Sequence, residues 1–117
     1  MAVKNALAGI AVTDLRVSKD WYQKLFGREP DTHPVEELFE WNFPTNGWIQ
    51  IFRSKSLAGS SSVTLVENDF GKRLNDLRAA RYDIKKLVDS DNVKVAIIED
   101  PDGNEVVFAQ GQHKAVA

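Results

Sequence analysis

The sequence predicts a small α+β domain made of two copies of one strand–helix–strands unit. The order of elements occurs twice, with an offset of about 55 residues that lays Asp14 on Asp69. In each copy a short apolar strand precedes a helix with one apolar stripe, and strands ending in a hairpin follow. The 117 residues suit one domain. We therefore expect a single domain over 1–117, with module one at about 6–53 and module two at about 61–110.

The elements of module one are indicated by local signals. Asp14 can cap a helix, Gly27 is a natural helix end, and Asn46-Gly47 between two apolar runs predicts a hairpin turn. The expected elements are a strand over 7–12, a helix over 15–26, a loop over 31–37, and hairpin strands over 38–43 and 48–52.

Module two repeats this order after a linker over 53–61. Asn68 or Asp69 can cap its helix, and Asp100-Pro101-Asp102-Gly103 has the composition of a tight turn. The expected elements are a strand over 62–66, a helix from Phe70, a short strand over 84–88, and hairpin strands over 93–99 and 105–109. We expect a frayed tail from Gly111 onward.

Alternation along the first hairpin predicts one aromatic face. A loop of two or four residues would place six side chains together: Phe39, Trp41, Phe43, Trp48, Gln50 and Phe52. Such a face is either hydrophobic core or a ligand cleft, because clefts are mostly apolar with a few polar groups that orient the ligand. On the second interpretation, Trp41 or Trp48 stacks on the ligand.

Two motifs carry a family resemblance that covers about residues 6 to 110. Val12-Thr13-Asp14-Leu15 with Ser18, Trp21-Tyr22 and Leu25-Phe26-Gly27 resembles the opening of the vicinal oxygen chelate superfamily, which includes glyoxalases, bleomycin-resistance proteins and extradiol dioxygenases. Glu99-Asp100-Pro101-Asp102-Gly103-Asn104 resembles its closing hairpin. The resemblance implies two βαβββ modules whose strands form a curled mixed sheet, a half-open barrel around a cleft, and a homodimer.

The resemblance also implies where a metal would be bound. Metal-dependent members hold a divalent ion at one position near the start of each module and one on its last strand. These positions correspond here to Leu7, Gln50, Ser61 (within one or two residues) and Val107. None is His, Asp or Glu, and Leu and Val offer no lone pair. We therefore expect no metal and no other cofactor, with Ser61 and Val107 joining the six hairpin residues as ligand-binding candidates.

Few other residues suggest chemistry. His33 in a loop and His113 in the tail are weak candidates for metal ligands, and Glu105 is a weak candidate for a catalytic acid or base. Glu36, Glu37 and Glu40 form an acidic strip that either solubilises the surface or attracts cationic ligands at the mouth of the cleft.

The composition of the chain argues against several classes of protein. The chain has no cysteine, a formal net charge of -2 and no basic stripe, so we expect neither a disulfide framework nor a nucleic-acid partner. No apolar run approaches the ~18 residues of a membrane span, and a cytoplasmic location is the default expectation.

Three functions remain open. The favoured one is a metal-independent small-molecule-binding protein of the bleomycin-resistance type, whose ligand is aromatic or cationic. The alternatives are a diverged glyoxalase-like lyase or isomerase and a dimeric structural module without a ligand. With the metal positions vacant in the sequence, we lean against an enzyme.

Overall fold

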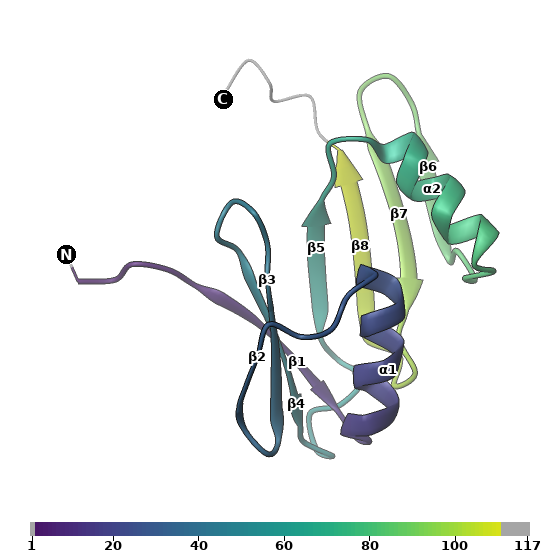
Figure 1. Ribbon diagram of the computed structural model, residues 1–117. Coiled ribbons are helices and arrows are strands. Elements are labelled where there is room, and N and C mark those ends of the chain that lie inside the picture. The colour runs from purple at the N-terminus through teal and green to yellow at the C-terminus, as the bar shows by residue number, and fades with distance from the viewer. Residues whose placement is uncertain (1, 111–117) are drawn as a thin grey trace. The chain divides into compact units, whose positions relative to one another are not determined.

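The computed structural model describes residues 2–110. The elements, shown in Figure 1, are β1 (Leu7–Val12), α1 (Leu15–Phe26), β2 (Thr32–Val35), β3 (Leu38–Asn42), β4 (Trp48–Arg53), β5 (Ser62–Val66), α2 (Phe70–Ala79), β6 (Lys86–Asp89), β7 (Lys94–Glu99) and β8 (Glu105–Gln110). They form two βαβββ modules. Each has one helix and one open four-stranded mixed sheet, in the order β1-β4-β3-β2 and β5-β8-β7-β6. The predicted fold class is confirmed.

Contacts group the described residues into two compact units. Unit one contains the residues up to Ser61 together with the turn Asp100–Asn104. Unit two contains Ser62–Glu99 and the residues from Glu105 onward. The tail predicted to fray lies outside the described residues.

The two helices begin and end where local chemistry predicts. The Asp14 carboxylate accepts from the Val17 amide at 3.1 Å, and Asp69 accepts from the Lys72 amide at 3.0 Å. These bonds satisfy amides that have no partner within the helix. Gly27 has the left-handed φ of 73° that ends α1 at low cost.

The segment expected to be a loop over 31–37 contains strand β2. Its side chains are all exposed, and its pairing with β3 is irregular between Thr32↔Glu40 and Val35↔Leu38. The segment contains a proline and only one aliphatic residue, Val35, so it lacks the apolar alternation that identifies strands in sequence. Its pairing with β3 places it at the edge of the sheet. A smaller shift occurs at β6, which runs over Lys86–Asp89 where 84–88 was expected.

The β3–β4 hairpin closes around a five-residue loop. Asn42 pairs with Trp48, and inside that pair the Phe43 amide donates to the Gly47 carbonyl at 2.8 Å. Asn46 takes the left-handed φ of 73° that this tight turn requires. With an odd number of loop residues, the odd-numbered residues of β3 share a face with the odd-numbered residues of β4. The expected loops of two or four residues would instead place them with the even-numbered residues of β4.

The predicted common aromatic face is therefore wrong. Directly paired residues project to the same side of a sheet, and the register pairs Phe39 with Ile51 and Trp41 with Ile49. The opposite side carries the residues of the other parity, among them Trp48, Gln50 and Phe52. A shift of one residue in pairing is enough to separate the two aromatic sets.

Trp41 belongs to the core of unit one. Its side chain is 0% exposed and packs against α1, with ring-centroid distances of 5.4 Å to Phe26 and 6.4 Å to Tyr22. Its indole N–H donates to the Arg28 carbonyl at 3.1 Å. Trp41 could stack on a ligand only if the core opened. The burial of its ring therefore contradicts the predicted stacking role of this residue.

A buried carboxylate connects the two motifs of the family resemblance. Asp100 is 5% exposed, and one of its oxygens accepts from the Tyr22 hydroxyl at 2.8 Å and from the Asn104 side-chain amide at 2.8 Å. The other oxygen accepts from the backbone amides of Asp102 and Asn104, both at 2.9 Å. Four donors therefore compensate the removal of this charge from water.

Asn104 extends the same network to the backbone. Its side-chain amide also donates to the Ala11 carbonyl at 2.8 Å, and its carbonyl oxygen accepts from the amides of Gly59 and Ser61 at 3.0 and 2.9 Å. Asn104 is 0% exposed, so each of these bonds is protected from water. The turn thus fixes β1 and the segment after β4 in one unit.

Unit two has its own core, on the helix side of its sheet. α2 packs on β8, and its buried side chains are Phe70, Leu74 and Leu77. The sheet contributes Val106 and Phe108, both 0% exposed.

Replacing Trp41 by alanine should lower the free energy of unfolding by about 3–5 kcal/mol, because it removes a fully buried ring and leaves a cavity. Urea denaturation followed by circular dichroism measures this loss. A Trp48→Ala variant is the matched control and should cost clearly less, since Trp48 is half-buried. Equal costs would contradict the assigned register.

Tyr22 should make the protein sensitive to alkali. Burial, and secondly the Asp100 carboxylate, raise the pKa of Tyr22 far above its ordinary value. In the unfolded chain the phenol ionises near pH 10, while in the folded chain it stays protonated. This contribution to stability is therefore complete below pH 10 and is lost as the pH rises further, by up to about 1.4 kcal/mol per pH unit.

The Tyr22→Phe variant isolates this effect. It should be less stable at pH 7 by about 1–3 kcal/mol, because Asp100 loses a donor. Between pH 9 and 11 its stability should fall less steeply than that of the parent protein, as measured by urea denaturation at each pH. Parallel slopes would show that Tyr22 ionises normally in the folded protein.

Candidate functional site

The candidate site is the side of the first sheet that faces away from α1. The helix packs on β4, and the β4 residues on the helix side, Ile49 and Ile51, are at most 1% exposed. The opposite side, which we call the open face, is assigned from the register. Its residues are Leu7, Gly9 and Ala11 on β1, Trp48, Gln50 and Phe52 on β4, Leu38, Glu40 and Asn42 on β3, and Thr32 and Val35 on β2.

The aromatic part of the open face lies on β4. Trp48 and Phe52 are half-buried, and Leu7, beside Trp48, is 43% exposed. Gly9 leaves room for the Phe52 ring, since a Cβ at residue 9 would lie 3.2 Å from Phe52 Cε1. The face thus offers two rings that a planar or apolar ligand can cover.

The polar part centres on Glu40. The Gln50 side-chain amide, directly across the strand pair, donates to one carboxylate oxygen at 2.6 Å. The Thr32 hydroxyl donates to the other oxygen at 2.7 Å. The carboxylate is therefore held in place from both sides. The partnership with Thr32 was not foreseeable, because β2 has no strand signal in the sequence.

The residues at the metal positions of the family do not form a metal site. Leu7 and Gln50 do lie on the same face, as the resemblance implies, but Leu7 has no donor atom and Gln50 is bonded to Glu40. Among residues 2–110, no three His, Cys, Asp or Glu side chains are grouped so that they could hold a metal ion.

The third position is better assigned to Ser62 than to Ser61. The pair Ser62↔Glu105 repeats the pair Leu7↔Trp48, within the tolerance of one or two residues given to this position. The Ser61 hydroxyl instead accepts from the Ala11 amide at 3.3 Å, a structural role.

In unit two, Val107 and Glu105 lie on one face of the sheet, as expected for alternate residues of β8. Val107 is half-buried and Glu105 is exposed. Neither Val nor Ser can bind a divalent ion as an anionic ligand.

The remaining aromatic candidates lie on the helix side of the first sheet. Phe43 contacts Phe26, with ring centroids 5.4 Å apart. Phe39 stacks on His33 at 4.1 Å, and the Lys19 ammonium lies 5.7 Å from its ring centre. Phe39, Trp41 and Phe43 are therefore not on the face that carries Trp48, Gln50 and Phe52.

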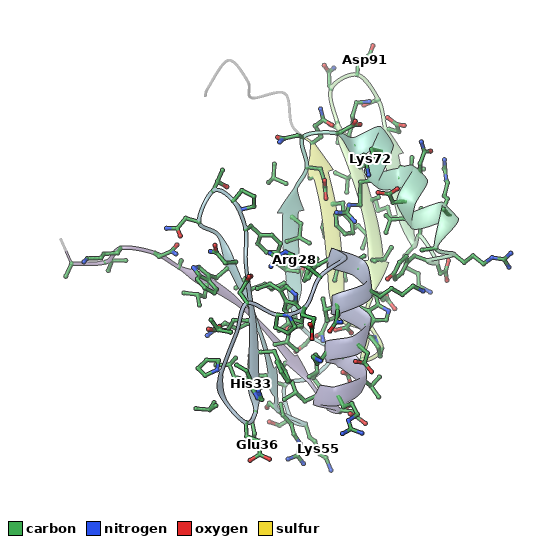
Figure 2. All side chains as sticks on the ribbon, in the orientation of Figure 1. Arg28, His33, Glu36, Lys55, Lys72 and Asp91 are labelled. Atoms are coloured by element: carbon green, nitrogen blue, oxygen red, sulfur yellow. The ribbon has the colours of Figure 1, made fainter. Side chains whose placement is uncertain are left out.

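The acidic strip is also divided. Glu40 lies on the open face, whereas Glu37 pairs with Arg53 at 3.4 Å. Glu36 and His33 lie at the end of the β2–β3 hairpin (Figure 2), and the His33 Nε2 is 3.2 Å from the Glu36 carbonyl. The second histidine, His113, lies outside the described residues.

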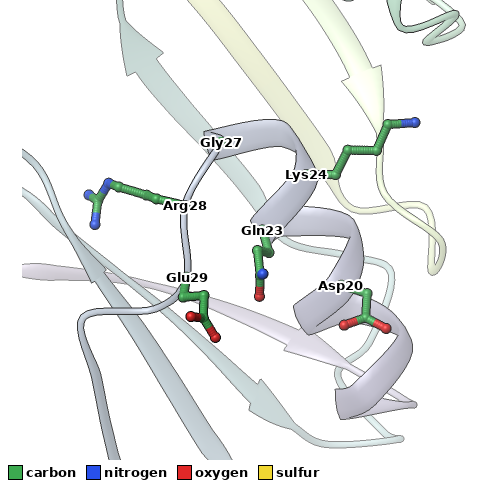
Figure 3. Close-up of a pocket in the computed structure, with 6 residues that line it drawn as sticks. All are labelled: Asp20, Gln23, Lys24, Gly27, Arg28 and Glu29. Carbon is green, nitrogen blue, oxygen red and sulfur yellow. The ribbon is translucent and has the colours of Figure 1, made fainter.

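Depressions also occur on the helix side of unit one. One of about 650 Å³ is lined by Leu15, Arg16, Lys19, Asp20, Glu36 and Phe39. Another of about 570 Å³ surrounds the end of α1 (Figure 3) and is lined by Asp20, Gln23, Lys24, Gly27, Arg28 and Glu29. Most of the residues that line either depression are charged, and Phe39 is the one aromatic residue among them.

Comparison with solved structures identifies the fold. A glyoxalase/bleomycin resistance protein from Catenulispora acidiphila is 29% identical with a TM-score of 0.82, covering 91% of this chain and 96% of that one. TnmS3, an antibiotic binding protein from Streptomyces sp. CB03234, is 18% identical with a TM-score of 0.80, over 96% and 99%. A lactoylglutathione lyase from Agrobacterium tumefaciens is 14% identical with a TM-score of 0.77, over 97% of both chains.

These matches confirm the predicted resemblance to the vicinal oxygen chelate superfamily and the glyoxalase/bleomycin-resistance fold. No protein-family model and no curated protein matches the sequence. Within residues 2–110, neither helix has the length and apolar character needed to cross a membrane.

Replacing Gln50 by glutamate should test the open-face register. The variant places two carboxylates directly opposite each other and removes the bond to Glu40, which should cost about 1–2 kcal/mol at pH 7. Repulsion raises the pKa of at least one of the two carboxyls, so this cost should shrink as the pH falls through 4. Thermal unfolding at pH 4 and 7 measures it. A cost independent of pH would show that the two side chains do not face each other.

Proposed function

We propose that this chain, which has the glyoxalase/bleomycin-resistance fold, is a metal-independent small-molecule-binding protein. Its ligand lies on the open face, against Trp48 and Phe52. The observation that carries the proposal is the placement of these half-buried rings, with Gln50 and Glu40 between them, on the side of the sheet that the module's own helix leaves uncovered. Apolar rings with a few fixed polar groups are the usual composition of a ligand site.

Metal independence is supported by donor chemistry. At the positions where metal-dependent relatives carry His or Glu, module one has Leu7 and Gln50, and module two has Ser62 and Val107. No imidazole or carboxylate is available at any of them, although divalent ions of this kind require such ligands. A binding function also agrees with the description of TnmS3 as an antibiotic binding protein.

A lyase or isomerase is the second candidate function. It is favoured by one observation, the presence of a carboxylate on the open face that could accept a proton from a bound substrate. Both oxygens of Glu40 already accept hydrogen bonds from neutral donors, which favours a binding role for Glu40. Glu105 remains the other proposed base. We further propose that the protein forms a homodimer in solution.

Trp48 should report ligand binding by its fluorescence. The chelator-treated protein is titrated with a panel of aromatic and cationic small molecules that includes bleomycin. A ligand that covers Trp48 should quench the emission in a saturable way, and Trp48→Phe should remove most of the quenching. Trp48→Ala should weaken binding about tenfold, measured by calorimetry, because it removes the stacking surface.

Trp21→Phe is the matched control, since Trp21 lies on α1 and packs against Tyr22 at 4.7 Å. It should leave both quenching and affinity unchanged. Binding that appears only after a divalent metal is restored would contradict metal independence. Quenching that survives in Trp48→Phe but disappears in Trp21→Phe would place the ligand on the helix side.

A further inference from the structure

Glu40 is the only ionisable side chain on the open face as defined above. The strands β1–β4 direct no lysine, arginine or histidine to this side of the sheet. The other open-face residues are apolar or neutral. The formal charge of this surface is therefore that of a single carboxylate.

The donors that hold Glu40 do not compensate its charge. The Gln50 amide and the Thr32 hydroxyl are both neutral, at 2.6 and 2.7 Å. Two other acidic residues of unit one do have a cationic partner, since Asp31 is paired with Arg28 at 2.6 Å and Glu37 with Arg53 at 3.4 Å. Gln50 and Thr32 therefore fix the position of a negative charge and leave it uncancelled.

On the open face, Glu40 is the diagonal neighbour of both aromatic residues. Gln50 is directly across from Glu40, and Trp48 and Phe52 are the next open-face residues on either side of Gln50 along β4. Diagonal neighbours of this kind are within reach of long and aromatic side chains. A cation at this point can be attracted both by the carboxylate and by the ring faces.

We propose that Glu40 makes the open face selective for organic cations that carry an aromatic ring. This inference rests on the proposed function and identifies the class of its ligand. The ring of the ligand covers Trp48 or Phe52, while its cationic group lies against the Glu40 carboxylate. An anionic analogue is excluded by repulsion, and a neutral analogue binds through stacking alone.

Three probes of similar size test the selectivity: benzyltrimethylammonium, benzyl alcohol and phenylacetate. Binding is followed by NMR through the Trp48 indole N–H signal, which is assigned from the spectrum of Trp48→Phe. The parent protein should bind benzyltrimethylammonium at least tenfold more tightly than either other probe. This preference should decrease at high salt, because exposed charges are screened.

Two variants separate charge from structure. Glu40→Gln keeps the size of the side chain and should reduce the preference for the cation over the alcohol to less than threefold, with the affinity for the alcohol unchanged. Gln50→Lys keeps Glu40 but adds a compensating charge, and should have the same effect. Glu37→Gln removes an acidic residue that is already paired with Arg53, and should leave the preference unchanged.

The outcomes distinguish a failure of cation selectivity from a failure of the proposed binding function. Equal binding of the cation and the alcohol by the parent protein would overturn cation selectivity, and the proposed function would stand. An unchanged preference in both Glu40→Gln and Gln50→Lys would likewise overturn the role of Glu40. Absence of binding by all three probes and by the wider panel would overturn the proposed function and this inference together.

Discussion

The fold of unit one depends on a buried carboxylate. Four donors surround the buried Asp100 carboxylate, among them the Tyr22 hydroxyl from α1 and the Asn104 side chain from its own turn. Removing one partner of such a group leaves much of its desolvation cost unmet, so the donors stabilise the structure jointly. The opening and closing motifs of the sequence resemblance are therefore one physical unit. Tyr22 and Asp100 are 78 residues apart in sequence, yet each makes the burial of the other tolerable.

This network also determines which side chains reach the open face. Asn104 binds the Ala11 carbonyl and so holds the end of β1 in place. β1 pairs in parallel with β4, which puts Gly9 beside Gln50 and gives the Phe52 ring its space. Side chains alternate along a strand, so Gln50 projects to the same face as Gly9, and the separate pairing of β3 with β4 puts Glu40 directly opposite Gln50. The geometry of the proposed ligand surface thus follows from contacts that no ligand would touch.

Local sequence signals predict where most helices and strands lie, but they do not predict which side chains share a face of the β3–β4 hairpin. The limits of α1 were predictable because Asp14 and Gly27 act on the helix ends directly, through a side-chain bond and a left-handed φ. The strand β2 was missed because its stability comes from pairing with β3 and from the Thr32 bond to Glu40, and neither leaves a pattern in the sequence. Alternation along the hairpin predicts a common aromatic face only for a turn with an even number of residues, and the turn has five. A turn of five residues shifts the pairing of the two strands by one residue relative to a turn of four. The composition of the turn does not determine which of the two forms.

The two modules share one backbone arrangement but carry different side chains at equivalent positions of their sheets. Their registers place two sets of residues at equivalent positions: Leu7, Trp48 and Gln50 in the first module, and Ser62, Glu105 and Val107 in the second. On the helix side of both sheets the central side chains, such as Ile49 and Ile51 in the first and Val106 and Phe108 in the second, are apolar and buried, because each helix must cover them to form a core. On the other side the same positions carry an amide and an aromatic ring in one module, and a carboxylate and an aliphatic chain in the other. Backbone pairing needs only amides and carbonyls, so the hydrogen bonds of the sheet do not determine which side chains occupy these positions. In the function we propose, the ligand chemistry of this chain therefore depends on a few open-face residues, above all on Glu40, whose two hydrogen-bond donors are neutral.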